Sequence, residues 1–228
     1  MNVCTYTLNL GSYDHYHGCP ELNPRWDNLY VTDHEFEPPE NWGRNVFLTV
    51  PTPTGDPKRA VCRFKILTHH LPHYHNISVW IDASFKLKQP IDKLVQDFAE
   101  SSDQIRMFPH PRRNCTYQEA QACLAGKLDD PDIITRQMAQ YIEEGLPVGY
   151  GMVAAGLIFR KNTMAVNAFN MLWANAYEKG SRRDQLSVMY AAWKLGMKIG
   201  HLDKSLYSND YFHLCCHRTG HETIRIKA

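Results

Sequence analysis

The stretch Ile77-Ser78-Val79-Trp80-Ile81-Asp82-Ala83-Ser84 decides the fold class. It opens with an apolar run that is short enough to form one fully buried strand, and such strands are typical of parallel sheets covered on both faces. The run ends abruptly at the carboxylate of Asp82. Ligands of open α/β sheets bind beyond the carboxyl ends of the strands, so function is expected where this strand stops.

The sequence before this strand predicts two further strands and one helix. Residues 3–10 alternate in polarity and residues 29–32 form a short apolar run, so both are predicted strands. The proline-rich stretch 35–54 is predicted to be mostly loop. Asp56 followed by Pro57 starts a predicted helix that runs to about residue 67, with Val61, Phe64 and Ile66 facing inward.

The sequence after the strand is mainly helical in pattern. Pro90 opens a predicted helix, and Thr116 with Glu119 forms a predicted capping box for another. The remaining predictions are helices at 131–144, 164–178 and 182–195 and a strand at 156–160.

Strands that alternate with helices predict an α/β fold with a central, mostly parallel sheet flanked by helices. The chain has 228 residues, 43% of them hydrophobic, which is enough for one substantial core. We therefore expect a single domain over residues 1–228.

Composition argues against several functional classes. A net charge of +1 shows no basic excess for nucleic acid, and no run of 18 apolar residues predicts a membrane span. The first residues lack the pattern of a secretion signal. Seven cysteines without a C-x-x-C pair argue against a disulfide framework and favour a cytoplasmic location.

Asp82 and Ser84 are the first candidate ligands. They lie two residues apart at the end of a buried strand, and Mg²⁺ or Mn²⁺ prefers oxygen ligands from few carboxylates together with substrate phosphates. The alternative is an Asp that turns a β-hairpin between Ile81 and Phe85. On this segment alone the turn is the commoner use of such a residue.

Basic residues on the preceding predicted helix form a second candidate group. Arg59 and Arg63 are four residues apart and share one face, whereas Lys65 lies on a different side. They suit a phosphate or sugar clamp. A solvated basic face that pairs with nearby acids is the common alternative.

Two further segments carry chemistry. Asp184 stands at the start of a predicted helix, where it could either face a sugar as a base or, with Ser181, simply form a capping pattern. The tail around His213 is rich in Cys and His, but the adjacent Cys215 and Cys216 do not match zinc-ligand spacing. His213 completing the shell of a metal at Asp82 is the more economical hypothesis, and a plain surface histidine or a zinc-stabilised interaction domain are the alternatives.

Taken in order, several short motifs resemble one known family. They are Tyr6-Thr7-x₃-Gly11-x-Tyr13-Asp14, Val31-Thr32-Asp33, Asp56-Pro57-x-Arg59-Ala60, Arg63-x-Lys65-Ile66-Leu67, Trp80-Ile81-Asp82, His110-Pro111-x-Arg113, Arg160-x₂-Thr163, Phe169-Asn170-x₂-Trp173 and Arg183-Asp184-Gln185-Leu186-Ser187. The pattern, over residues 3–200, resembles the glycosyltransferase-like family once catalogued as a domain of unknown function, which includes plant proteins of cell-wall polysaccharide synthesis. It is also similar to the small glycosyltransferase domain of large viruses that infect chlorella algae.

This resemblance implies a GT-A fold and a transferase that moves a sugar, rhamnose or glucose, from a UDP-sugar to a glycan hydroxyl. It implies a metal at Asp82 and a catalytic base at Asp184. The residues implied to hold the donor are Thr7, Asn9, Tyr13, Asp33, Arg59, Arg63, Lys65, Asp82, Ala83 and Ser84, and those implied for the acceptor are His110 and Arg113. If the resemblance is to the viral domain, the expected location is the host cytoplasm. Whether the chain is the N-terminal part of a longer polypeptide with further domains stays open.

Two departures from the family pattern bear on these expectations. Ser84 stands where GT-A enzymes carry the second acid of an Asp-x-Asp motif, so only one strong carboxylate is left for the metal. Ala154 and Ala155 stand where relatives carry an acidic residue, which leaves acceptor preference open. We expect direct displacement with inversion. A retaining transferase and an inactive nucleotide-sugar or glycan-binding module are the alternatives.

Overall fold

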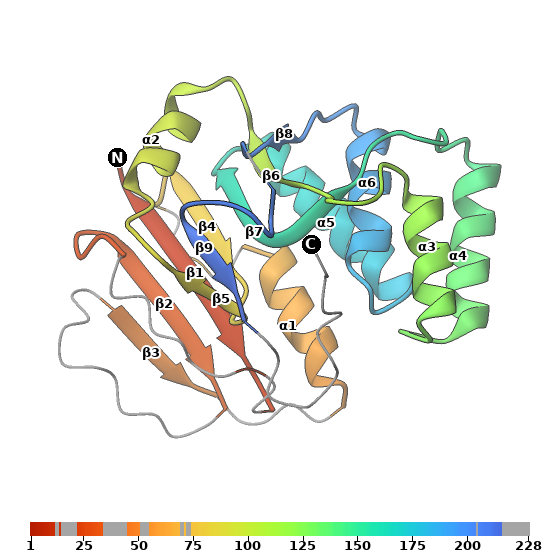
Figure 1. The fold of residues 1–228 in the computed structure, drawn as a ribbon, viewed down its shortest axis with the longest axis horizontal. Helices are drawn as coiled ribbons and strands as arrows, with labels where there is room; N and C mark the ends of the chain where they lie inside the picture. Colours follow the sequence, from red (N-terminus) through yellow and green to blue (C-terminus); the bar gives the residue numbers. More distant parts are fainter. Residues whose placement is uncertain are drawn as a thin grey trace.

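The computed structural model describes residues 1–11, 14, 22–33, 45–50, 55–68, 71, 74–203 and 205–215, with the backbone alone at 45–47. Within this part of the chain, seven strands form one sheet in the order β3-β2-β1-β4-β7-β6-β8 (Figure 1). Their bounds are β1 Val3–Asn9, β2 Asp27–Thr32, β3 Asn45–Thr49, β4 Ile77–Ile81, β6 Ile105–Pro109, β7 Val153–Lys161 and β8 Gly200–His201.

The direction of the strands determines which residues meet at each end of the sheet. β1, β2, β3 and β4 pair in parallel, and β7 is antiparallel to both β4 and β6. β8 is parallel to β6. β6 therefore runs in the same direction as β1 and β4, and β7 alone among these strands is reversed. The carboxyl ends of β1, β2, β4 and β6 share one edge with the amino end of β7, and we call this the carboxyl edge.

Two layers cover the sheet. Helices α1 (Pro57–Ile66), α5 (Met164–Lys179) and α6 (Gln185–Lys194) pack on one face, as Figure 1 shows. α2 (Asp92–Glu100) and a small sheet of β5 (Phe85–Leu87) and β9 (Phe212–Leu214) pack on the other. Helices α3 (Thr116–Ala125) and α4 (Pro131–Glu143) extend the first layer beyond α6.

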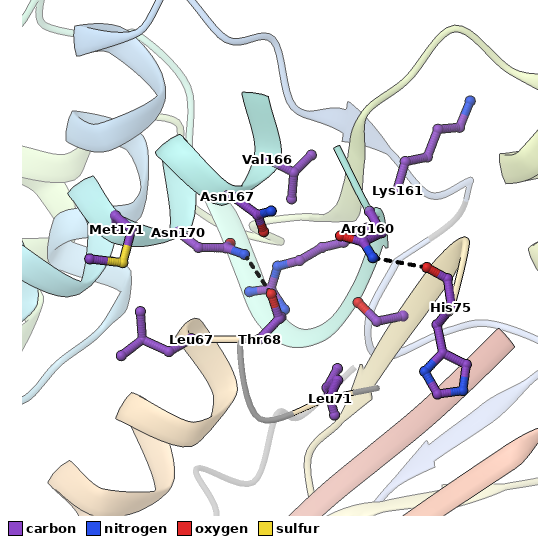
Figure 2. Close-up of a pocket in the computed structure, with 12 residues that line it drawn as sticks. Leu67, Thr68, Leu71, His75, Arg160, Lys161, Val166, Asn167, Asn170 and Met171 are labelled. Atoms are coloured by element: carbon purple, nitrogen blue, oxygen red, sulfur yellow. Dashed lines mark hydrogen bonds between the residues drawn. The ribbon is translucent and has the colours of Figure 1, made fainter. Parts of the chain in front are cut away.

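The edge of the sheet opposite the carboxyl edge carries a small cavity of about 150 Å³ (Figure 2). It lies between the end of α1, the start of β4, the end of β7 and the first turns of α5. Ser78, Arg160, Val166 and Asn170 are among the residues that line it.

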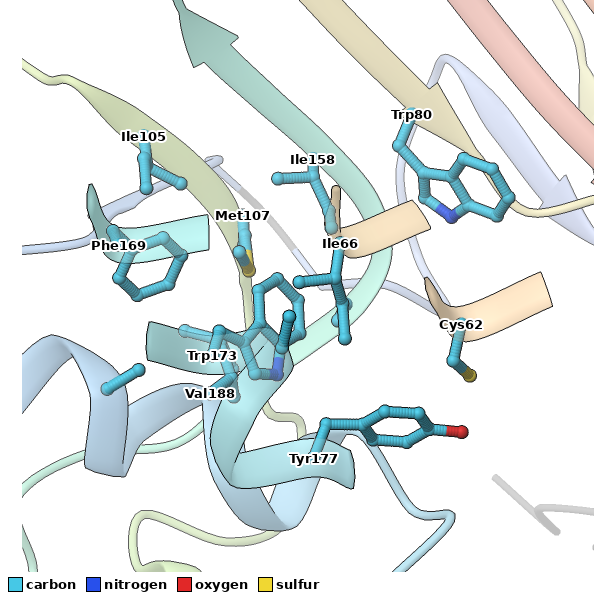
Figure 3. Close-up of a cluster of buried hydrophobic side chains, with 14 of the residues drawn as sticks. Cys62, Ile66, Trp80, Ile105, Met107, Ile158, Phe169, Trp173, Tyr177 and Val188 are labelled. Carbon is cyan, nitrogen blue, oxygen red and sulfur yellow. The ribbon is translucent and has the colours of Figure 1, made fainter. Parts of the chain in front are cut away.

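The largest core cluster lies between the sheet and the α1–α5–α6 layer (Figure 3). Trp173 of α5 and Ile66 of α1 are fully buried there, as are Trp80 and Ile158 of the sheet. Full burial of one large apolar side chain contributes about 1.5–3 kcal/mol, so this cluster fixes α1 and α5 on β4. α1 in turn carries Lys65, which lies at the centre of the site described below.

The expected α/β architecture with a mostly parallel sheet flanked by helices is confirmed. β4 is buried at every position, as its unbroken apolar run predicts. The predicted strands 3–10 and 156–160 correspond to β1 and β7, and the predicted helix 131–144 corresponds to α4. Asp56 caps α1 through the amide of Lys58, as expected.

The structure adds strands and corrects some local predictions. β3 lies inside the stretch 35–54 that is predicted to be mostly loop, and β5, β6, β8 and β9 have no counterpart among the predicted strands. The capping box of Thr116 and Glu119 does not form, because Thr116 is already helical and Glu119 binds Arg113 instead. In α1, Cys62 and Lys65 are buried with Ile66, whereas Val61 and Phe64 are only partly buried.

Candidate functional site

The carboxyl edge gathers most of the described residues that the sequence singles out. Asn9 ends β1, Asp33 follows β2, Asp82 follows β4 and His110 follows β6. The reversed β7 brings its amino end to the same edge, where the carbonyl of Gly156 accepts a hydrogen bond from the Asp82 amide at 2.8 Å. Tyr13 lies outside the described residues. This edge is the site at which ligand-binding α/β sheets place their chemistry.

Lys65 is the centre of the site. Its ammonium lies 2.6 Å from Asp184 Oδ2 and 3.6 Å from Asp82 Oδ1. It also donates to the carbonyl of Ala155 at 3.2 Å. The lysine side chain is only 6% exposed, so its ammonium is largely shielded from water and salt. Three separate elements therefore place two carboxylates around one buried cation.

These contacts shift the pKa values of all three groups. Burial lowers the pKa of Lys65, but the charges of Asp184 and Asp82 raise it by more, so the net shift is upward. Burial raises the pKa of Asp184, but Lys65 and Arg183 together bring it below its ordinary value. Burial raises the pKa of Asp82, Lys65 opposes this and Asp184 adds to it, and the net shift is upward. The resting site thus favours an ammonium beside an ionised Asp184.

Asp82 is held in place by hydrogen bonds to backbone groups and to the nearby side chain of Trp80. Its Oδ1 accepts from the indole of Trp80 at 2.5 Å, and its carbonyl accepts from the Phe85 amide at 2.9 Å. The turn expected as the alternative is thus present, but β5 pairs with β9 and not with β4, so no hairpin forms. With 32% of its side chain exposed, Asp82 is both positioned and open to a ligand.

Asp184 occupies the N-cap position of α6, yet its side chain makes no capping hydrogen bond. Ser181, the other member of the expected capping pattern, donates instead to Asp129 at 2.6 Å. The Asp184 carbonyl accepts from the Trp173 indole at 3.1 Å, which fixes the residue to α5. The carboxylate is therefore directed to Lys65 and not used by its own helix.

Arg59 and Arg63 make different contacts from Lys65. Arg59 donates to the carbonyls of Tyr177 and Gly180 at the end of α5. Arg63 pairs with Glu178 at 2.8 Å, and its side chain is 60% exposed. Both arginines thus engage α5, in the manner of the basic face that pairs with nearby groups. Their predicted role in donor binding stays a prediction.

The predicted donor residues of β1 and β2 take part in polar contacts at the carboxyl edge. Thr7 donates to the carbonyl of Ile81 at 2.9 Å and thereby joins the ends of β1 and β4. Asn9 donates to the carbonyl of Asp14 at 2.9 Å. The Asp33 carboxylate accepts from the amide of Gly11 at 3.0 Å from both oxygens, which holds the turn after β1 against β2.

The two predicted acceptor residues share one buried acid, Glu119 of α3. Arg113 lies 2.5 Å from Glu119, and His110 Nε2 lies 3.5 Å from the same oxygen. His110 Nδ1 accepts from the amide of Arg113 at 3.0 Å, so the neutral ring carries its proton on Nε2. Burial lowers the pKa of His110, Glu119 opposes this, and the net shift is downward. The cluster lies just after the end of β6, at the carboxyl edge.

The chemistry of the donor set fits a hard cation only in part. Asp82 supplies one partly exposed carboxylate, while Ser84 is buried and its carbonyl accepts a hydrogen bond from the amide of Cys215 at 2.7 Å. His213 is exposed and pairs in register with Lys86 across β5 and β9. No group of three or more His, Cys, Asp or Glu in the described residues is placed to hold a metal. A cation here would take its other oxygen ligands from a bound diphosphate.

Some residues that shape the site have little or no sequence pattern that would predict their role. The carbonyl of Ala155 contacts Lys65, and Gly156 allows β7 to approach Asp82, since a Cβ there would lie 3.2 Å from Asp82 Oδ2 and 2.6 Å from the Phe85 ring. A glycine inside a strand pattern is the one available signal, because it often marks a close approach of backbone. The sequence pattern predicts Glu119 as part of a helix cap and gives no sign of its contacts with Arg113 and His110.

The family comparison covers the segments that build this site. A family model described as the TOD1/MUCI70 glycosyltransferase-like domain matches residues 44–221, a range that includes Lys65, Asp82 and Asp184. The family model thus places the chain in the class of glycosyltransferase-like domains. The chain belongs to the TOD1/MUCI70 glycosyltransferase-like domain family.

The chain is also similar in structure to several solved glycosyltransferases. The bifunctional glycosyltransferase WbbM matches at 9% identity and a TM-score of 0.49, over 88% of this chain and 38% of WbbM. GlyE of Streptococcus pneumoniae TIGR4 matches at 9% identity and 0.45, over 89% of this chain and 45% of GlyE. Mouse xyloside xylosyltransferase 1 matches at 11% identity and 0.48, over 89% of this chain and 86% of the mouse protein.

A comparison with curated protein sequences gives no match. Among the described helices, none has the length and apolar character needed to cross a bilayer.

Proposed function

We propose that this chain transfers a sugar from a UDP-sugar to a hydroxyl of a glycan, with a divalent cation, Mn²⁺ or Mg²⁺, and with inversion at the sugar carbon. The observation that carries the proposal is the contact of one buried ammonium, Lys65, with both Asp82 and Asp184. This contact brings a metal-binding candidate and a base candidate into one site at the carboxyl edge. The sequence resemblance supplies rhamnose and glucose as the first donors to try.

Each residue has a distinct role in this proposal. Asp82, with Ser84, would hold a cation whose charge offsets that of the diphosphate leaving group. Asp184 accepts the proton of the acceptor hydroxyl at a carboxylate oxygen. Its lowered pKa keeps it deprotonated before the reaction, and Lys65 keeps it oriented. His110 and Arg113, fixed by Glu119, contact the acceptor sugar.

The role of Asp184 is tested by Asp184→Asn, which keeps the shape of the side chain and removes the base. We expect sugar transfer to fall by about 10²–10⁴-fold, because that is the usual contribution of a general base. UDP affinity, measured by calorimetry, should remain within a few-fold of the parent. Asp97→Asn on the exposed face of α2 is the matched control. Full turnover by Asp184→Asn would exclude the role.

The role of Asp82 is tested separately by binding and not by turnover. Calorimetric titration of UDP with and without Mn²⁺ should show metal-enhanced binding in the parent protein. Asp82→Ala should remove the enhancement, whereas Asp203→Ala, an exposed control, should keep it. Equal UDP affinity of the parent protein with and without Mn²⁺ would refute the proposal that a cation takes part in UDP binding.

One observation fits a second candidate, a retaining transferase, equally well. Asp184 is paired with Lys65 at 2.6 Å and its side chain is 12% exposed, which suits a residue that positions Lys65 as well as one that reaches an acceptor. In that case Asp184 is not the base. The anomeric configuration of the product, determined by NMR, separates the two mechanisms. Absence of both transfer and UDP-sugar hydrolysis in the presence of Mn²⁺ would instead indicate an inactive binding module.

A further inference from the structure

The cavity at the opposite edge of the sheet contains a buried cation that the proposed reaction does not use. Arg160, at the end of β7, is 1% exposed and lines this cavity. Its Nη1 donates to the Tyr6 hydroxyl at 2.5 Å, and its guanidinium lies 5.7 Å from the centre of the Trp173 ring. No carboxylate in the described residues forms an ion pair with it. We call this cavity the Arg160 pocket.

The unused atoms of Arg160 have a specific geometry. Nε and Nη2 are buried and have no hydrogen-bond partner among the described residues. These two nitrogens form the lateral edge of the guanidinium, whose parallel N–H groups match the two oxygens of a carboxylate or a phosphate. Burial of a charged group without a partner is costly, so an oxyanion at this edge would stabilise the fold.

The surrounding side chains complete a site. Asn170 is 2% exposed, its Nδ2 donates to the Thr68 hydroxyl at 3.2 Å, and its Oδ1 has no partner among the described residues. Figure 2 shows Asn170, Thr68 and Arg160 close together in the pocket. A half-turn of the amide exchanges its oxygen and nitrogen, so that Thr68 donates to Asn170 and Nδ2 becomes a further donor beside Arg160. In this orientation Asn170 and Arg160 both present unpaired N–H donors to the pocket.

We propose that the Arg160 pocket binds a small carboxylate through the lateral edge of Arg160. Leu71 and Val166 are buried and give the pocket an apolar wall, which suits a carboxylate with a short aliphatic tail better than a free phosphate. The cavity of about 150 Å³ limits the ligand to a few heavy atoms. The pocket lies at the amino end of β4, away from Asp82 at its carboxyl end, so this ligand is distinct from the sugar donor.

The proposal is tested through the Arg160 Nε–H resonance in ¹H–¹⁵N NMR spectra, which Arg160→Lys identifies by its loss. Sodium butyrate and sodium phosphate are titrated against sodium chloride at equal ionic strength. A saturable downfield shift with butyrate, and a weaker or absent one with phosphate, is expected. A resonance that moves with phosphate but not with butyrate would contradict the proposal that the ligand is a carboxylate. A resonance that moves with neither would contradict the proposal that the Arg160 pocket binds an anion.

A second variant places the anion inside the protein. Asn170→Asp puts a carboxylate beside the free edge of Arg160, so the thermal midpoint should rise by about 3 °C and the butyrate response should disappear. Asn175→Asp, on the exposed side of the same helix, should change neither. An undiminished butyrate response in folded Asn170→Asp would show that the anion binds elsewhere.

Discussion

Lys65 stands in the last turn of α1, where a cation is favoured by the helix dipole, yet it is buried and not solvated. The side chain reaches inward because Ile66 and Cys62 dock the helix against the core on either side of it. Burial of a lysine is tolerated here because two carboxylates and one carbonyl satisfy its charge and its donors.

Removal of the ammonium should be more harmful than removal of the whole ion pair. Lys65→Met leaves Asp184 buried and unpaired, so the free energy of unfolding should fall by about 3–5 kcal/mol. Lys65→Met combined with Asp184→Asn removes both charges and should recover part of that loss. Urea unfolding of the parent, both single variants and the double variant measures the coupling. Additive losses would show that the two side chains do not interact in solution.

Gly156 is the second residue on which the geometry of the site depends. A methyl group there would lie 2.6 Å from the Phe85 ring and 3.2 Å from Asp82 Oδ2. Gly156→Ala should therefore lower the free energy of unfolding by about 1–3 kcal/mol through overpacking. It should also weaken UDP binding, since Asp82 must move. Gly196→Ala is a poor control because of its positive φ, so Ala168→Gly, at an exposed position of α5, serves as the reference for a change of one methyl group. An unchanged unfolding midpoint for Gly156→Ala would contradict the close approach.

At the scale of elements, α4 is joined to α6 by one polar hub. Glu144, the residue after α4, accepts from Tyr190 at 2.7 Å and pairs with Lys194 at 2.5 Å, both on α6. The hydrogen bonds of Lys194, Tyr190 and Gln140 lower the pKa of Glu144 to about 2. The hub thereby fixes α4 to α6, whose first residue follows Asp184.

This hub predicts a dependence of stability on pH. The lowered pKa means that the contribution of Glu144 is present in full above its ordinary value near 4.5 and is lost as the pH falls toward about 2. The free energy of unfolding should therefore decline across this window. Glu144→Gln should make the decline shallower, whereas Glu143→Gln, its exposed neighbour, should leave it unchanged. Chemical denaturation at several pH values checks this, and equal slopes for parent and Glu144→Gln would contradict it.

At the scale of the whole molecule, the end of the described chain returns to the site. β9 pairs with β5, and the amide of Cys215 donates to the carbonyl of Ser84, so the last described segment braces the turn after Asp82. Phe212 anchors this segment, with its ring 5.8 Å from that of Phe85 and 6.4 Å from that of Phe108.

The anchoring of β9 can be tested by truncation of one side chain. Phe212→Ala should lower the free energy of unfolding by about 3–5 kcal/mol, because it removes a buried ring and leaves a cavity. UDP affinity should fall as well, since the Asp82–Ser84 turn loses its brace. Tyr207→Ala, at a ring that is 51% exposed, should have little effect on either quantity. Parent-like UDP binding by folded Phe212→Ala would separate β9 from the site.

The sequence by itself determined the class of the fold and the positions at which chemistry could occur. The apolar run that ends at Asp82 specified a buried strand, and the cap at Asp56 specified where a helix begins. These features are local, since burial pattern and capping depend on residues close together in the chain. Short edge strands such as β8 and β9 lack such a pattern and were missed.

Only the tertiary structure decided which of these residues meet. Lys65, Asp82 and Asp184 are far apart in the chain, and the packing of α1 and α6 on the sheet brings them within ion-pair distance. The same packing turned Glu119 from an expected cap into a partner of Arg113 and left Arg160 buried without an acid. The physical reason is that pairing of charges inside a core depends on long-range geometry, which no short sequence pattern encodes.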